Sequence, residues 1–410
     1  MIKKDMTVSS RTGRIKVIDV LRGISLIGIC LIHSMQHFGV AGTNSPQTFF
    51  VWEGTLDGIF GWMISNLVAG KFYIIFSCLF GLSFFIQMDR AALGGIDFRP
   101  RFLWRLTLLL LFGYTLGLIF CIEILLIYAL VGFVLVLMYK WSTKLLVGIV
   151  VFLFLGGVPL MSLGIRTWTA STKVEQVDVH TTSAQTTLTQ RESPRPRIQT
   201  SPTLSETIRY NAWDGLNRKM NYQFSSGRIY LTLGLFILGF IIGRIRLFER
   251  LPELRLRLLR MAGGALVLIA LLSLAEIYIP SVVRGEVSIY SWLGTTVGNI
   301  KNLCIAYIGS IVIMEAYRST RIQRLAEPLV NYGRMGLTNY AVQSVLGVFI
   351  FAGFGFNWSH LGVTLSVFVG ITYTILQILF SYYWLRAFRY GPFEWLWRSG
   401  TYLKWQPLKR

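Results

Sequence analysis

The stretch that decides the fold is RIKVIDVLRGISLIGICLIHSMQHFGV, residues 14–40. It is apolar enough and long enough to cross about 30 Å of hydrocarbon as one helix. Four ionisable side chains nevertheless interrupt it: Asp19, Arg22, His33 and His37. A charge at the centre of a membrane helix costs roughly 2.5–3.5 kcal/mol on insertion scales, so such a residue usually has a partner or a task. The stretch therefore predicts a membrane helix that carries a candidate site.

The spacing of these residues predicts one polar stripe on the helix. Arg22 and His33 differ by about 20° around the helix axis and by about 16 Å along it, and His37 follows His33 by one turn. A stripe running from near one membrane face to near the other suits a substrate path through a helix bundle. The alternative is that Asp19 and Arg22 form an ion pair near the interface, with the histidines in the outer headgroup layer. This helix alone leaves both interpretations open.

Composition places the whole chain among multispan membrane proteins. Of its 410 residues, 53% are hydrophobic and only 14% are charged. The net charge of +21 comes from basic residues spread among the ends of apolar segments, which is a topology signal and not a nucleic-acid-binding patch. The four cysteines are scattered within apolar segments and match no metal or disulfide pattern. The lipid bilayer is the expected partner, and nucleic acid is not.

Segment lengths and the placement of Lys and Arg predict an all-α polytopic protein with about ten transmembrane helices and both termini in the cytoplasm. The second apolar segment is too long for one ordinary crossing, and Gly70 and Lys71 divide it into an interfacial or re-entrant helix and a crossing. The expected spans cover residues 14–40, 56–88 (crossing at 72–88), 102–122, 124–139, 145–163, 229–245, 261–279, 292–316, 337–356 and 361–384.

A polar segment divides the chain into two membrane halves. Residues 1–165 form the N-terminal five-helix half, and residues 228–410 form the C-terminal five-helix half with a basic cytoplasmic tail. Between them, residues 166–227 are rich in Ser, Thr and Gln and predict an extracytoplasmic loop. Its second part, ETIRYNAWDGLNRKMNYQF at 206–224, contains aromatic and apolar residues. This part is suited either to lie along the membrane surface or to cap a cavity.

Polar residues at membrane depth extend the candidate site beyond the first helix. Glu123 is expected at the outer turn of its helix, at a depth similar to that of His33, where the two would make a proton-transfer pair with the imidazole as base. Asn339 and Gln343 lie one turn apart and favour a shared contact, with another helix or with substrate. No phosphate-binding glycine loop, zinc signature or nucleophile elbow is present. Glycine-rich GLFILGFIIGR, residues 234–244, is interpreted as a site of close helix packing.

Two C-terminal stretches resemble the hallmarks of a bacterial membrane family catalogued as domain of unknown function 418. They are YGRMGLTNYAVQSVLG at 332–347 and RYGPFEWLWRSGTYLKWQPLKR at 389–410. The resemblance extends to IDVLRGISLIGI at 18–29, GKFYIIFSCLFGLSFFIQMDR at 70–90 and EILLIYALVG at 123–132. It covers nearly the whole chain except the polar segment. The resemblance implies a multi-pass protein of the bacterial plasma membrane.

The first-helix signature of that family is distantly similar to that of transmembrane acyltransferases, which include the acyltransferase-3 proteins and the lysosomal heparan glucosaminide acetyltransferase. In acyltransferase-3 proteins an Arg is followed, after ten intervening residues, by a His, and Arg22 and His33 have this spacing. The resemblance implies transfer of an acyl group from cytoplasmic acyl-coenzyme A to a hydroxyl or amine outside the membrane. The acceptor would be a small molecule, a glycan or a lipid.

The leading hypothesis gives each candidate residue a role in that reaction. His33 is the general base, and Glu123 orients it. Arg22 and Lys71 hold thioester or phosphate groups of the donor. The remaining substrate-binding candidates are Asp19, His37, Asn339 and Gln343, and no metal is expected.

Two other hypotheses use the same residues. A transporter or permease for a small solute or lipid precursor would show saturable flux without covalent change to the solute. A structural membrane protein would use its buried polar groups only to specify helix packing. Substitution of His33 or Lys71 would then change stability without removing an activity. Assembly into a homo-oligomer is compatible with all three hypotheses.

Overall fold

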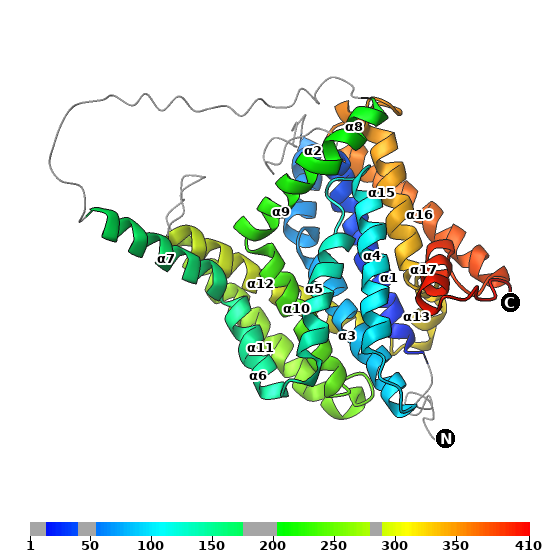
Figure 1. The fold of residues 1–410 in the computed structure, drawn as a ribbon, viewed down its shortest axis with the longest axis horizontal. Helices are drawn as coiled ribbons and strands as arrows, with labels where there is room; N and C mark the ends of the chain where they lie inside the picture. The colour runs from blue at the N-terminus through cyan, green and yellow to red at the C-terminus, as the bar shows by residue number, and fades with distance from the viewer. Residues whose placement is uncertain (1–13, 40–54, 175–202, 279–288) are drawn as a thin grey trace.

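The computed structural model describes residues 14–39, 55–174, 203–278 and 289–410 (Figure 1). All secondary-structure elements in these ranges are helices, apart from one isolated β-bridge between Phe388 and Lys409. The all-α fold class is therefore confirmed. The α-helices are α1 Lys16–Met35, α2 Thr55–Met63, α3 Lys71–Leu93, α4 Arg99–Gly117, α5 Leu125–Leu137, α6 Thr143–Phe154, α7 Gly157–Val174, α8 Leu204–Tyr210, α9 Leu216–Ser225, α10 Arg228–Arg244, α11 Leu251–Tyr278, α12 Ile289–Ala316, α13 Thr320–Leu325, α14 Glu327–Arg334, α15 Gly336–Phe351, α16 Val363–Ala387 and α17 Pro392–Tyr402. Short 3₁₀ or π segments are η1 His37–Gly39, η2 Ile64–Val68, η3 Met138–Lys140, η4 Asn211–Gly215 and η5 Trp358–His360.

Several of these helices have the length and composition of membrane spans. Among the described residues, five segments qualify: α1, Thr55–Leu93, α11, α12 and α16. The number rises to seven if two bent helix pairs each count as one span, α6 with α7 at 61° and Leu204–Ser225 with α10 at 69°. The chain is thus a helical protein with several potential spans. The ten-span topology and the cytoplasmic placement of both termini stay predictions.

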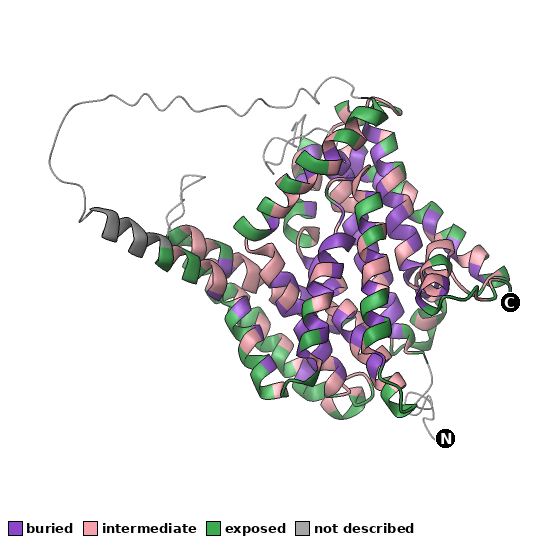
Figure 2. Cartoon of the chain, in the orientation of Figure 1, coloured by how far each residue is buried: buried purple, intermediate pink, exposed green. Residues whose placement is uncertain are grey.

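The most buried helices lie at the centre of the bundle, and apolar side chains also cover its outside. Figure 2 shows buried residues concentrated on the central helices, which include α1, α3, α5 and α10. By contrast, α11 exposes Leu266, Val267, Leu271 and Leu274, each by more than half of its side-chain surface. A contiguous exposed apolar face is rare on a water-soluble monomer. It is the expected surface of a helix that contacts lipid chains.

Close contact between α3 and α10 depends on glycine. A Cβ added at Gly81 would lie 1.9 Å from the carbonyl oxygen of Phe236, and one added at Gly239 would lie 1.9 Å from that of Cys78. Because no side chain fits at either position, the two backbones pack directly against each other. This finding confirms the interpretation of the glycine-rich segment 234–244 as a helix-packing surface.

The C-terminal helix α17 is attached to the bundle through the partly buried carboxylate of Glu394. Glu394 Oε1 accepts hydrogen bonds from the backbone N–H groups of Leu337, at 2.6 Å, and Thr338, at 3.1 Å, at the start of α15. The hydroxyl of Thr338 donates to Glu394 Oε2 at 2.5 Å. Otherwise unpaired N–H groups at the first turn of α15 are satisfied in this way.

Much of the polar segment 166–227, which the sequence predicted to be a loop, is helical. Helix α7 continues to Val174, and residues 204–225 are helical through α8, η4 and α9. Residues 175–202, which hold the most polar part of the predicted loop, lie outside the described residues. The three elements of residues 204–225 are called the helical arm below. The arm crosses the bundle at the end opposite the start of α1 (Figure 1).

Candidate functional site

A cavity of about 350 Å³ lies beneath the helical arm. Its walls come from the C-terminal end of α1, the start of α3, the connection between α4 and α5, the arm, and α15. Cavities of this size are within the usual range for small-molecule sites. The first-helix stretch, residues 14–40, contributes Gly28, Ile29, Ile32 and His33 to its lining.

The arm turns one face toward this cavity. Its lining residues are spaced by three or four positions along the helix: Thr207, Tyr210, Asn211, Gly215, Arg218, Lys219, Tyr222 and Gln223. A capping box starts the arm, because Thr203 Oγ1 accepts from the N–H of Glu206 and Glu206 Oε2 accepts from the N–H of Thr203. These hydrogen bonds also lower the pKa of Glu206 below its usual value. Of the two alternatives left open for residues 206–224, the structure shows the cavity cap.

Two polar contacts fasten the arm to the connection between α4 and α5. Lys219 forms an ion pair with Glu123, and the side chains are 9% and 0% exposed. Asn211 Nδ2 donates to the carbonyl oxygen of Leu118 at 3.0 Å. Glu123 also accepts from the N–H of Leu126 at 3.2 Å. Beyond the arm, Gly227 adopts a positive φ of 71°, which allows the chain to turn into α10.

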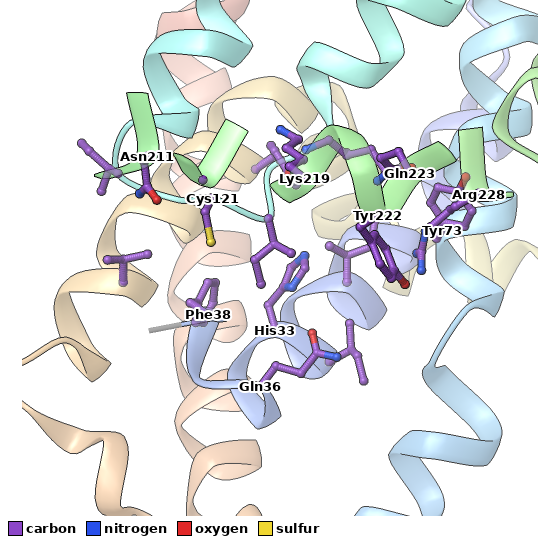
Figure 3. A pocket seen from close by; sticks show the side chains of 18 of the residues that line it. His33, Gln36, Phe38, Tyr73, Cys121, Asn211, Lys219, Tyr222, Gln223 and Arg228 are labelled. Carbon is purple, nitrogen blue, oxygen red and sulfur yellow. The ribbon is translucent and has the colours of Figure 1, made fainter. Parts of the chain in front are cut away.

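His33 lies at the cavity without a protein partner for one of its nitrogens. Its Nδ1 atom is buried and has no hydrogen-bond partner among the described residues. The ring packs edge-on against Phe120, with centroids 5.2 Å apart, and at a tilt against Phe38, at 5.8 Å. In Figure 3 the imidazole rises from α1 toward the arm. The aromatic contacts hold the ring in place, and Nδ1 remains available to a ligand.

The charged groups at the cavity are cationic. Arg228, the first residue of α10, lies over the ring of Tyr73 at 4.4 Å, and Arg218 lies 5.6 Å from the ring centroid of Tyr210. Figure 3 shows Arg228, Tyr73 and Tyr222 together on one side of His33. The lining residues that the structure describes include no Asp or Glu. The cavity therefore favours a ligand with negative charge.

The structure separates Asp19 and Arg22 from the cavity. Arg22 binds Asp19 at 2.9 Å and the hydroxyl of Ser83 at 3.0 Å, and Asp19 also pairs with Arg14 at 2.5 Å. None of these side chains lines the cavity. The arrangement matches the alternative given for this helix, an ion pair near its beginning. A role for either residue in substrate binding stays a prediction.

His37 also has protein partners. Its Nε2 lies 3.0 Å from the hydroxyl of Ser366 and 3.1 Å from the carbonyl oxygen of Leu361, and its ring stacks on Phe351 with centroids 4.8 Å apart. These contacts join the end of α1 to the start of α16. The two histidines thus differ in setting, since His33 meets the cavity and His37 joins helices.

The other predicted residues are dispersed through the bundle. Lys71 starts α3 and is directed to the carbonyl oxygen of Ser65 at 3.5 Å. Asn339 Nδ2 donates to the carbonyl oxygen of Tyr332 at 3.0 Å and to Ser381 Oγ at 2.9 Å, which joins helices. Gln343, one turn away, is fully buried, and neither its Nε2 nor its Oε1 has a partner among the described residues. Asn339 and Gln343 therefore share no hydrogen-bond partner among the described residues, and a shared contact with substrate stays a prediction.

Sequence reasoning missed the residues that give the cavity its charge and much of its polarity. These include Arg218, Arg228, Gln223 and Tyr73. A usable signal was present, because polar and aromatic residues recur at helical spacing through residues 207–223. The direction in which that face points follows only from the packing of the arm.

Comparison with known proteins gives relatives along the full chain. Residues 242–404 match the family described as "Protein of unknown function (DUF418)". The chain is 30% identical to the uncharacterized protein YxaH of Bacillus subtilis, over 97% of this chain and 96% of that protein. It is 27% identical to the uncharacterized protein YeiB of Escherichia coli, over 94% and 95% of the two chains. No solved structure matches.

Proposed function

The chain belongs to the family described as protein of unknown function DUF418, and we propose that it is a membrane acyltransferase in which His33 is the general base. One observation carries the proposal. The imidazole of His33 lines an internal cavity, and its Nδ1 has no hydrogen-bond partner among the described residues. A buried polar atom without a partner usually indicates a functional role or a missing ligand. The distant resemblance of the Arg22–His33 spacing to acyltransferase-3 proteins adds the type of reaction.

The proposed reaction uses the imidazole as a proton shuttle. An acceptor hydroxyl or amine in the cavity attacks the carbonyl carbon of an acyl thioester, and His33 takes the proton that the acceptor loses. The new ester or amide forms as the carbon–sulfur bond breaks. The departing thiolate receives the proton from the imidazolium. Proton transfer by a positioned side chain typically accelerates a reaction by about 10²–10⁴-fold.

Glu123 receives a different role from the one that its depth suggested. Its carboxylate binds Lys219 and the N–H of Leu126, and among the described contacts none joins it to His33. We assign Glu123 to holding the arm over the cavity. It is a positioning residue because it acts through Lys219.

Under this proposal the donor and the acceptor reach the reaction centre from opposite faces of a bacterial plasma membrane. The positive-inside distribution of Lys and Arg favours an orientation with the arm outside and the start of α1 inside. Arg22 is about 16 Å from His33 along α1, so the thioester must extend into the bundle to reach the imidazole. Arg22 and Lys71 stay the proposed contacts of the acyl-coenzyme A donor.

The test is release of free thiol from acetyl-coenzyme A. Purified protein is reconstituted into vesicles, acetyl-coenzyme A is added, and thiol appearance is followed with a chromogenic disulfide. The expected result is saturable release that requires wild-type protein and is lost in His33→Ala. Equal release by His33→Ala would overturn the assignment of the base. Titration calorimetry with coenzyme A, with Arg22→Ala alongside, tests the donor contact separately.

A transporter is the second candidate, and the position of the cavity supports considering it. Helix α1 contributes to the cavity lining only from Gly28 onward, and Asp19 and Arg22 are not among the lining residues. A carrier in a one-sided state would present such a cavity. Uptake of a labelled solute without thiol release and without covalent change would favour this candidate over acyl transfer.

A further inference from the structure

The charge balance of the cavity indicates what it binds. Lys219 is neutralised by Glu123 behind the lining. Arg218 and Arg228 form no ion pair within the described part of the chain. Their contacts with Tyr210 and Tyr73 hold the guanidinium groups in place but leave both charges uncompensated. Arginine in such a setting is well suited to phosphate, which it binds with two parallel hydrogen bonds.

The same cavity also contains a hydrogen-bond acceptor that has no hydrogen-bond donor among the described residues. Gln223 on the arm is 7% exposed, and its Oε1 has no hydrogen-bond partner among the described residues. The Nδ1 atom of His33 has none either. An anionic phosphate group offers only acceptors, so it cannot satisfy the carbonyl oxygen of Gln223, whereas a ligand hydroxyl or amine can donate to it. The same hydroxyl can donate to His33 Nδ1 when that atom is the unprotonated nitrogen required of a base. The polar groups therefore fit a ligand that combines a phosphate ester with a free hydroxyl.

The rest of the cavity is apolar and limited in size. Ile29, Ile32, Phe72, Val348 and Phe354 contribute to its lining. A volume of about 350 Å³ accommodates a head group and the beginning of an alkyl chain, but not a whole two-chain lipid. A lipid bound here would keep its chains in the bilayer.

We propose that the cavity binds the head group of an anionic lipid, in which a phosphodiester contacts Arg218 and Arg228 and a free hydroxyl faces Gln223 and His33. The hydroxyl is thereby placed where an acceptor of the acyl group is required. That last step rests on the proposed function, whereas the binding itself does not. Free glycerol phosphate has the same polar chemistry without the chains, so the experiment has to separate the two sources.

Cys121 provides a direct probe because its thiol lines the cavity (Figure 3). In a Cys30→Ala, Cys78→Ala, Cys304→Ala background, Cys121 is labelled with methanethiosulfonate reagents that carry either a sulfonate or a trimethylammonium group. The anionic reagent is expected to react faster, and Arg228→Gln is expected to reduce that preference about tenfold. Arg250→Gln is the matched control, since Arg250 pairs with Glu253 away from the cavity. Each rate is divided by the rate of the same reagent with a free thiol in solution, and equal ratios for the two reagents would overturn the anionic site.

Protection of Cys121 then identifies the source of the phosphate. Labelling is repeated in detergent with phosphatidylglycerol, phosphatidylcholine or glycerol 3-phosphate added. Protection by phosphatidylglycerol, but by neither of the others at equal concentration, is the expected result. Equal protection by glycerol 3-phosphate would overturn the lipid assignment, and so would equal protection by phosphatidylcholine. Specific protection without thiol release from acetyl-coenzyme A would leave this inference intact and reject the acyltransferase.

Discussion

Lys219 on the helical arm is ion-paired with Glu123 on the connection between α4 and α5, and both side chains are almost completely buried, with exposures of 9% and 0%. The pair joins residues 96 positions apart and keeps the arm over the cavity that contains His33. It gives Glu123 a partner other than the imidazole with which the sequence had associated it. The strength of this contact therefore affects the site as well as the fold.

Removing one partner of this pair is expected to be more harmful than removing both. Lys219→Met leaves the Glu123 carboxylate buried without its cation, which typically costs about 3–5 kcal/mol. The double variant Lys219→Met, Glu123→Gln removes both charges and is expected to recover most of that loss. Denaturant unfolding of the wild type, Lys219→Met, Glu123→Gln and the double variant in detergent measures the coupling. Additive effects of the two substitutions would contradict the buried pair.

His33 and His37 are expected to respond differently to the same substitution. His33→Gln should reduce thiol release from acetyl-coenzyme A by about 10²-fold or more, because a base in the cavity is lost. Its melting temperature should fall less than that of His37→Gln, because His33 loses only its ring contacts with Phe120 and Phe38 and its Nδ1 has no protein partner among the described residues.

His37→Gln is the matched control for this measurement. It loses the stacking on Phe351 and changes the contact with Ser366, so its melting temperature should fall while the activity of the folded fraction persists. If instead His33→Gln lost stability and His37→Gln lost activity, the assignment of the general base to His33 would be wrong.

Gly239 is expected to tolerate no side chain. In Gly239→Ala the new Cβ would meet the carbonyl oxygen of Cys78 at 1.9 Å, so α3 and α10 must separate. Overpacking of this kind typically costs about 1–3 kcal/mol. Gly263→Ala on α11 is the control, because nothing lies within 4 Å of its added Cβ, and it should be neutral or slightly stabilising. Similar melting temperatures for the two variants would show that the helices are not in direct contact.

Glu394 is expected to make stability depend on pH. Burial raises its pKa above the usual 4.5, while its hydrogen bonds to Thr338 and Leu337 oppose that shift. Because the folded-state pKa exceeds the unfolded value, the stabilisation is complete below pH 4.5 and is lost as the pH rises through the folded-state pKa. The melting temperature of the wild type relative to Glu394→Gln should therefore fall with increasing pH. Parallel curves for the two proteins would refute the titration of this carboxyl.

The helical class, the potential membrane spans and part of the helix packing could be predicted because they depend on local sequence. An apolar segment of about 20 residues must satisfy its backbone internally in lipid, so it forms a helix whatever its neighbours are. Small residues in segment 234–244 likewise indicated close packing before any partner was known. The break of the second apolar segment at Gly70, which has a φ of 81°, also followed from a local property.

Contacts between distant elements could not be predicted in this way. Helical periodicity places Glu123, His33 and Arg22 on faces and at depths, but it does not identify the element that covers each face. Glu123 met Lys219 because the arm folds back over the connection between α4 and α5, and Arg22 met Asp19 because they lie three residues apart on one helix. The predicted depth of Glu123 was consistent with its position near the arm, but its ion-pair partner is Lys219 and not His33.

The sequence by itself determined that the described part of this protein is helical, with several potential membrane spans and ionisable groups on its first helix, since length, hydropathy and spacing are properties of each segment alone. Only the tertiary structure decided that His33 faces a cavity, that His37 joins α1 to α16, and that Arg218, Gln223 and Arg228 share the site with His33. The physical reason is that burial and pairing are set by whichever helix packs opposite a residue. In this chain the element opposite His33 comes from a segment that looked like a loop.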